Sequence, residues 1–351
     1  MLRVSYLALL CKMLFVRLSS IFFGAVSLLS VQAAVIERRS GRTSPPSGCI
    51  VVSKSASSGQ FSTVQAAVDS LSTTSSAKQC IFIYQGTYTE QVYIAPRSAQ
   101  LTIYGYTTDT SSYSGNTVTI TQSRSQDNVA SNDLTATLRA WNEGLKVYNI
   151  NLQNTRGAGS QALALSASNT KQGYYGVKFI GYQDTLYPNT GYQVYAKCYI
   201  EGAVDFIFGM QARAWFDDVD IRIKGVGFIT ANGKDSESNP SYYIINNSDI
   251  RVADGVTLPA GSTYLGRPWR NWSRVIFQNT AMSDVVNSAG WRYWNVGDER
   301  TDHVYYKEFR NTGTGASGTR ASFSSSLSAA NPITLLFGSS YKSWVDTDYL
   351  S

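Results

Sequence analysis

Short apolar segments with the pattern of β-strands recur along most of the chain, and this recurrence limits the folds available to it. Matching positions in successive segments lie about 21 to 31 residues apart, with Gly, Asn and Asp between them. The segments are Lys146–Leu152, Gly176–Tyr182, Gln193–Ile200, Trp215–Ile223, Tyr243–Ile250 and Arg274–Thr280. A repeat of this length with one or more strands is typical of a solenoid, in which each coil buries an apolar stripe against its neighbours.

The contents of each repeat indicate the type of solenoid. Leucine-rich repeats need Leu at fixed offsets, which the segments lack, and propeller blades need four strands and a longer period. A parallel β-helix is the class that remains. Residues 61–71 carry apolar side chains at helical spacing and predict one amphipathic helix, which would cap the open N-terminal end. We therefore expect an all-β protein in which residues 40–351 form a single parallel β-helix domain with a short N-terminal capping helix.

The first 39 residues differ from the rest. They have a basic start, an apolar run from Leu18 to Leu29 and a small-residue exit at Val31–Ala33, which together predict a secretory signal peptide at residues 1–33. The apolar run is shorter than the about 20 residues of a membrane helix, which disfavours a permanent anchor. Arg38-Arg39 is a dibasic pair that would end a short propeptide at residues 34–39. We expect a secreted protein with no membrane attachment after the signal is removed.

Secretion changes the interpretation of the cysteines, because disulfides persist in oxidising compartments. Cys49 and Cys80 each open an apolar run, so neighbouring strands in register would bring the two thiols close enough to bridge. The sequence thus predicts a Cys49–Cys80 disulfide and leaves Cys198 as a buried free thiol. Two sequons allow N-glycosylation, at Asn246 and Asn271.

The reactive residues that the chain lacks exclude several classes of protein. One His and no Gly-x-Ser-x-Gly segment argue against a Ser-His-Asp hydrolase, and there is no phosphate-binding loop. We expect no metal and no cofactor, because three Cys and one His after residue 39 do not make a structural zinc site. Without residues 1–39 the chain has 25 basic and 23 acidic residues, and this charge of +2 does not suggest nucleic-acid binding.

Two aspartates are spaced for chemistry between carboxyl groups. Asp184 and Asp205 lie 21 residues apart, about one short coil, which would place them on adjacent rungs about 4.8 Å apart. Two carboxyl groups this close do not ionise together, so one becomes an acid and the other a base or nucleophile. Asp205 also lies within the apolar run Val204–Phe208 and needs a cationic partner, for which Arg267 is the best candidate.

Stacked amides accompany this pair in the sequence. Gln161 precedes Gln183 by 22 residues, again about one coil, and two stacked amides can donate hydrogen bonds to a developing oxyanion. Ladders of Asn, Gln and Asp also stabilise β-solenoids without any catalysis, and the spacing alone leaves both interpretations open. Trp291 and Trp294 are equally open, either as sugar-stacking platforms or as core residues.

Seven segments taken together resemble the pectin methylesterases, the enzymes that remove methyl groups from pectin. The segments are Gly86–Glu90, Gln161–Leu165, Tyr182–Leu186, Gly202–Gly209, Leu265–Trp269, Gly290–Trp291 and Glu308–Ala316. No single segment decides the resemblance, but their order and spacing match the family over nearly the whole chain after the leader. The chain looks most like a fungal secreted form, and the resemblance implies a right-handed parallel β-helix that acts as a monomer on pectin (methylated homogalacturonan).

The resemblance also implies roles for individual residues. Asp205 matches the nucleophile, and Asp184 matches the acid that protonates methanol and then acts as a base. Gln161 and Gln183 match the amides that stabilise the oxyanion, and Arg267 matches the residue that orients Asp205. The residues that match the lining of the sugar groove are Tyr187, Phe208, Trp269 and Trp291.

Three other functions fit the residues of the sequence less well. Asp217-Asp218 and Arg222–Lys224 echo polygalacturonase motifs, but that class also needs Gly-His-Gly and the one histidine is His303 between Asp and Val. A pectate lyase would need an acidic cluster for calcium, which the sequence does not suggest. A non-catalytic polysaccharide-binding solenoid would keep the aromatic residues but has no need of a paired aspartate and arginine set.

Overall fold

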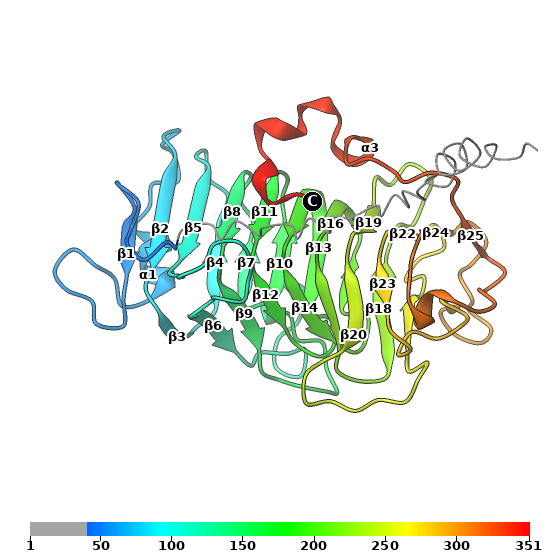
Figure 1. The fold of residues 1–351 in the computed structure, drawn as a ribbon. Helices are drawn as coiled ribbons and strands as arrows, with labels where there is room; N and C mark the ends of the chain where they lie inside the picture. The colour runs from blue at the N-terminus through cyan, green and yellow to red at the C-terminus, as the bar shows by residue number, and fades with distance from the viewer. Residues whose placement is uncertain (1–40) are drawn as a thin grey trace, which may run out of the picture. The chain divides into compact units, whose positions relative to one another are not determined.

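Parallel strands stack in successive coils through most of the chain. The computed structural model describes residues 41–351, so the predicted signal peptide and propeptide lie outside the described residues. Within them the strands form three ladders, each running the length of the stack, and the architecture is the parallel β-helix expected from the repeat (Figure 1). None of the helices in this part of the chain is long and apolar enough to cross a membrane.

The ladders are most simply given by their strands. The first ladder contains β4 (Val92–Ile94), β7 (Leu138–Ala140), β10 (Leu165–Ser168), the start of β13 (Leu186–Ala196), β15 (Ile207–Gly209), β18 (Gly227–Asn232) and β21 (Thr263–Gly266). The second contains β1 (Ile50–Val52), β2 (Gln79–Ile83), β5 (Leu101–Gly105), β8 (Leu145–Tyr148), β11 (Gln172–Tyr175), the end of β13, β16 (Gln211–Asp217), β19 (Tyr242–Asn246), β22 (Arg274–Gln278), β24 (Tyr305–Phe309) and β25 (Ser324–Ser326). The third contains β3 (Gly86–Thr89), β6 (Val118–Gln122), β9 (Asn151–Asn154), β12 (Lys178–Ile180), β14 (Tyr199–Gly202), β17 (Asp220–Ile223), β20 (Asp249–Val252) and β23 (Ala281–Met282).

The helices of the described residues are short and lie outside the coils. They are α1 (Val64–Asp69), α2 (Asn132–Thr135), α3 (Thr334–Phe337) and the 3-10 turns η1 (Thr314–Ala316), η2 (Ser339–Ser343) and η3 (Thr347–Tyr349). The helix predicted at residues 61–71 is therefore present but shorter. It starts late because Phe61 bridges to the first strand, where its N–H donates to the carbonyl of Val51 at 2.9 Å. Its buried side chains, which include Val64 and Val68, pack into the core at the first coil.

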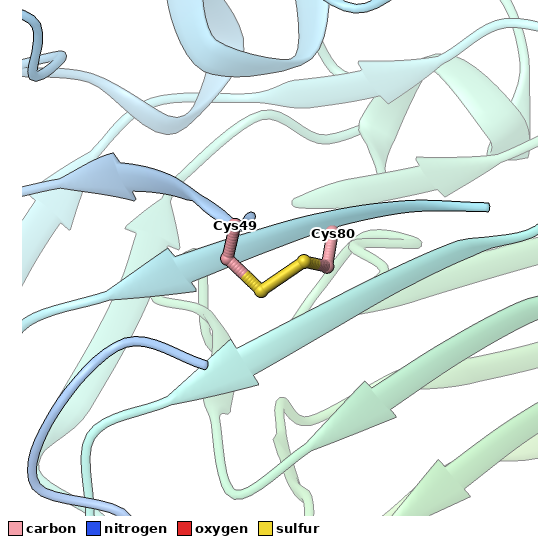
Figure 2. The surroundings of a disulfide bond; sticks show 2 residues. All are labelled: Cys49 and Cys80. Atoms are coloured by element: carbon pink, nitrogen blue, oxygen red, sulfur yellow. A yellow bond between two sulfur atoms is a disulfide. The ribbon is translucent and has the colours of Figure 1, made fainter. Parts of the chain in front are cut away.

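The predicted disulfide is present on the first coil. Ile50 of β1 pairs with Ile81 of β2, so the preceding residues, Cys49 and Cys80, are side by side with their Cα atoms 4.7 Å apart (Figure 2). Cys198 is free and buried, as expected. Burial raises the pKa of its thiol to about 12, which keeps it protonated and unreactive.

The coils bend between the second and third ladders through residues in the left-handed backbone conformation. Gly176, Lys197 and Asp218 occupy this bend in three successive coils, each 21 residues after the last. Asn149, Asn247, Asn279 and Arg310 occupy it in other coils. Inside the bends, aromatic side chains of neighbouring coils stack in register: Tyr195 lies 5.0 Å from Tyr174 and 4.7 Å from Phe216 between ring centres. The sequence repeat is thus the repeat of one packed coil.

The C-terminal segment covers part of the second ladder. It runs back across the strands after β25, shown in orange to red in Figure 1. Phe337 and Trp344 join the apolar cluster on the outer face of this ladder, where Tyr148 donates a hydrogen bond to Asp346 at 3.0 Å. The first ladder is the one that carries the candidate catalytic residues.

Candidate active site

One pocket on the first ladder brings together all the residues that were predicted to carry the chemistry. Its volume is about 350 Å³. Four of the residues come just before strands of this ladder, while the arginine comes just after β21. The five predicted catalytic residues in its lining are Gln161, Gln183, Asp184, Asp205 and Arg267.

The two aspartates occupy equivalent turns on neighbouring coils. Gln183 forms a parallel bridge with Val204, and the N–H of Asp184 donates to the carbonyl of Val204 at 3.0 Å. Asp184 and Asp205 both have left-handed backbones, with φ of 60° and 48°. This conformation is costly for most residues, although Asp tolerates it better, and it recurs at functional sites. The prediction that the two carboxyl groups lie on adjacent rungs is confirmed.

Arg267 holds the carboxylate of Asp205 through two parallel hydrogen bonds. Its Nε donates to Oδ1 at 2.9 Å and its Nη2 donates to Oδ2 at 2.7 Å. The guanidinium also makes cation–π contacts with two rings, since it lies 4.2 Å from the ring centre of Phe228 and 4.1 Å from that of Trp294. Burial raises the pKa of Asp205, and the hydrogen bonds and charge of Arg267 oppose this rise. The ion pair predicted for Asp205 is therefore present, in a geometry that fixes the carboxylate.

Asp184 has a different electrostatic environment from Asp205. It is 7% exposed, and its pKa is raised well above the ordinary carboxyl value by burial and by the charge of Asp205, with a smaller opposing effect of Arg267. Burial raises the pKa of both carboxyl groups, but the arginine opposes this rise at Asp205 through two hydrogen bonds, whereas at Asp184 the charge of Asp205 adds to it. The two carboxyl groups of the pocket therefore differ in how readily they ionise.

Two side-chain amides complete the polar lining. The N–H of Ala162 donates to the carbonyl of Gln183 at 3.2 Å, so Gln161 and Gln183 lie on neighbouring coils as their spacing suggested. Both amides line the pocket that contains the two carboxyl groups. Amide N–H groups beside a carboxylate can stabilise negative charge that develops on a substrate oxygen.

Aromatic rings border the polar residues. Tyr187 stacks on Phe208 with a centre-to-centre distance of 4.5 Å, and Phe208 contacts the edge of Trp269 at 5.9 Å. Phe208 and Trp269 line the pocket directly. The pocket thus combines two carboxyl groups that differ in their neighbours, two amides and an apolar wall, which suits an uncharged acyl compound such as an ester.

Comparison with known proteins gives the family. Residues 49–331 match the Pectinesterase family. The chain belongs to the pectinesterase family. A pectinesterase of Aspergillus niger is 51% identical over 328 residues, which cover 92% of this chain and 98% of the relative, and one of Aspergillus aculeatus is 50% identical over 327 residues, which cover 92% and 98%.

Comparison with solved structures points to the same family as the sequence relatives of this pectinesterase. The crystal structure of the deglycosylated pectin methylesterase from Aspergillus niger matches with a TM-score of 0.82 and 43% identity, covering 88% of this chain and all of that one. The pectin methylesterase from carrot matches with a TM-score of 0.78 and 28% identity, covering 88% of this chain and 98% of that one. The stacked parallel ladders are therefore those of pectin methylesterase β-helices.

One predicted groove residue is not in the pocket. Trp291 is 1% exposed and stacks on Tyr306 at 4.1 Å, with its Nε1 donating to Glu308 at 3.2 Å. The expectation that Trp291 lines the sugar groove is wrong, because its ring points into the core at the last coils. Trp294, which the sequence left undecided, lines the pocket instead.

One predicted glycosylation site is also contradicted. Asn246 is 8% exposed, and its side-chain nitrogen, the atom that would carry a glycan, donates to the carboxylate of Asp217 at 2.7 Å. This asparagine is part of a buried polar ladder, in which Gln278 donates to its oxygen at 2.9 Å. Asn271 is half-buried at the surface, and glycosylation there stays a prediction.

The sequence analysis did not identify several residues of the site. Gln126, Asn132 and Ala231 line the pocket, and Phe228 packs on Arg267. Gln126 and Asn132 belong to the connection between β6 and β7, which departs from the coil pattern, so spacing had no means of finding them. No group of three or more His, Cys, Asp or Glu residues in the part of the chain that the structure describes is arranged to hold a metal ion.

Proposed function

We propose that the chain hydrolyses the methyl esters of galacturonate residues in pectin, releasing methanol and leaving pectate. The observation that carries this proposal is the difference between two neighbouring carboxyl groups in one pocket. Asp205 is paired with Arg267, whereas burial and the Asp205 charge raise the pKa of Asp184. Membership of the pectinesterase family, with relatives that are themselves named pectinesterases, supports ester hydrolysis as the reaction.

The first half of the reaction forms an acyl-enzyme. A carboxylate oxygen of Asp205 attacks the carbonyl carbon of the methyl ester, and the negative charge moves to the carbonyl oxygen. The amides of Gln161 and Gln183 donate hydrogen bonds to this oxyanion. When the tetrahedral intermediate collapses, the bond to the methoxy oxygen breaks and Asp184 gives its proton to the departing methanol. Asp205 is then joined to the galacturonate acyl group as an anhydride.

The second half returns the enzyme to its starting state. Asp184, now ionised, takes a proton from a water molecule, whose oxygen attacks the acyl carbon. The bond to Asp205 breaks, the galacturonate carboxyl group is released, and Asp205 is again a carboxylate held by Arg267. The sum is ester plus water giving acid plus methanol, with no other reactant.

We also propose where the reaction takes place. The predicted leader at residues 1–33 and the Cys49–Cys80 disulfide both suit a protein that folds in the secretory route and acts outside the cell. A monomer is enough for the chemistry, because every residue assigned a role comes from one chain.

Methanol release from highly methylated pectin tests the proposal. Wild type should release methanol without added calcium and without producing new reducing ends or unsaturated products. Asp205→Asn, verified as folded by circular dichroism, should lose more than about a thousandfold in kcat, because the nucleophile is gone. Gln161→Ala should lose about a hundredfold, the effect of one oxyanion donor.

Two outcomes would contradict the proposal. Chain cleavage without methanol would mean that the pocket belongs to a glycosidase or lyase. Methanol release by Asp205→Asn at the wild-type rate would remove this residue from the role of nucleophile.

A further inference from the structure

We propose that Trp141 forms a further sugar-binding subsite for the pectin chain, on coils that precede the active-site pocket. This inference rests on the proposed function, because it assumes that the ligand is the same pectin chain whose methyl esters are hydrolysed in the pocket. The subsite would bind a sugar unit of the chain at a distance from the ester that is hydrolysed, and it would be built from Trp141 with Tyr93 beside it.

Trp141 is unusual among the tryptophans in its exposure. Trp141 is 37% exposed, while the other six tryptophans are half-buried or buried. It follows β7 directly, and its indole edge meets the ring of Tyr93 at 6.2 Å between ring centres. An aromatic face left in water costs free energy, which contact with the apolar C–H face of a sugar would recover.

The exposed indole is also fixed in position. Its Nε1 donates to Oδ1 of Asp133 at 2.9 Å. The same carboxylate accepts a hydrogen bond from Ser166 at 2.7 Å and forms an ion pair with Arg139 at 2.7 Å. Arg139 in turn lies 4.5 Å from the ring centre of Tyr93. A ring held by so many partners loses little conformational entropy when a ligand binds, which favours recognition.

This aromatic cluster is continuous with the active-site pocket. Across the first ladder, Arg139 pairs with Ser166, which pairs with Tyr187, the ring that stacks on Phe208 at the pocket. Because β7 and β15 are three steps apart in this ladder, the strand before Trp141 lies about 14 Å along the stack from the strand of Phe208, at about 4.8 Å per step. A polymer that lies along the ladder would pass over both places.

Helix α2 also connects the two places, through consecutive residues. Asn132 lines the pocket, and the next residue, Asp133, holds Trp141. The charge of Asp133 also contributes, with burial and Asp184, to raising the pKa of Tyr187 to about 12. The site that binds the ester and the site proposed for the distant sugar are therefore the two ends of one surface.

Binding of oligomers of increasing length tests the subsite without relying on turnover. Methyl-esterified galacturonan oligomers from three to eight units are titrated by calorimetry into Asp205→Asn, into Asp205→Asn with Trp141→Ala, and into Asp205→Asn with Trp141→Phe. We expect affinity to rise with length in the first protein and Trp141→Ala to weaken binding of the longest oligomers about tenfold. Trp141→Phe, which keeps an aromatic face, should bind close to the parent.

The controls separate this proposal from the proposed function. Leu335→Ala removes another exposed apolar side chain, 48% exposed and on the C-terminal segment, and should leave every affinity unchanged. Equal affinities for parent and Trp141→Ala at all lengths would overturn the subsite, as would an equal loss at all lengths. Methanol release by wild type is measured separately, so failure of the esterase activity would be seen independently of the length dependence.

Discussion

Asp184 and Asp205 are the same side chain in the same turn of successive coils, yet they behave differently because their neighbours differ. Arg267 supplies Asp205 with two charged hydrogen bonds, whereas Asp184 faces burial and the negative charge of Asp205. A buried acid that cannot ionise freely is a cost to folding at neutral pH. The residue that donates the proton in our proposal therefore destabilises the chain that carries it.

This cost predicts a pH-dependent gain in stability for Asp184→Asn. The pKa of Asp184 is higher in the folded protein than in the unfolded chain, so wild type loses stability as pH rises above the ordinary carboxyl pKa of about 4. Asn has no proton to lose. The melting temperature of Asp184→Asn should exceed that of wild type at pH 7, and the difference should shrink to nothing near pH 3.

Asp205→Asn is the matched comparison. It leaves the guanidinium of Arg267, whose side chain is 17% exposed, without its anion, so it should lose about 1–3 kcal/mol of stability at pH 7. Equal melting temperatures for Asp184→Asn and wild type at pH 7 would show that Asp184 ionises normally in the folded protein.

At the scale of single elements, two aromatic rings position Arg267, one from a strand of the first ladder and one from the connection between β23 and β24. Phe228 lies in β18, one step from β21, and its ring centre is 4.2 Å from the guanidinium, while the ring centre of Trp294 is 4.1 Å from it. A planar cation between two rings has little freedom to rotate. Phe228 thus orients Asp205 indirectly, because it fixes the arginine that binds the Asp205 carboxylate.

Phe228→Ala should therefore lower kcat without removing any catalytic group. We expect a loss of about tenfold to a hundredfold, since small displacements of reacting groups have effects of this size. A looser Arg267 also opposes the raised pKa of Asp205 less well, so the acid side of the pH–kcat profile should move to higher pH. Phe228→Tyr keeps the ring and should retain both the rate and the profile. A lower rate with an unmoved profile would argue against this indirect role.

The same scale shows what the sequence could and could not reveal. The repeat placed Asp184 and Asp205 on adjacent coils, because a regular coil turns spacing along the chain into distance. The repeat left Trp291 open, because the last coils contain long connections in which spacing no longer reports whether a ring faces inward, and the groove position that the resemblance implied for it is wrong. It also passed over Asn132 and Gln126, which reach the pocket from a connection outside the repeat.

For the whole molecule, stability is spread along the stack of coils, since each coil contacts mainly its neighbours. The Cys49–Cys80 bridge joins neighbouring strands of the first coils and closes a loop of 31 residues. The pocket is built on later coils, from the connection between β6 and β7 to the residues that follow β21. Stability at the N-terminal end and chemistry in the middle are therefore separable.

The double variant Cys49→Ser/Cys80→Ser should show this separation. Removing a cross-link over 31 residues should cost about 3–4 kcal/mol through the greater entropy of the unfolded chain. The melting temperature should fall by several degrees, while methanol release at 25 °C stays at the wild-type rate. Wild type treated with a reductant that opens the bridge should behave like the variant. A large loss of activity at 25 °C would instead mean that the first coil supports the pocket.

The 21-residue coil between Asp184 and Asp205 has a consequence for engineering the length of the chain. Residues 185–204 contain β13 and β14 with short connections, so an insertion or deletion there would shift Asp205 out of step with Asp184 and turn its side chain away. Residues 253–262, between β20 and β21, form a longer connection between ladders. A tag or fused domain should therefore be inserted in a connection of that kind. The coil between the two aspartates does not tolerate an insertion.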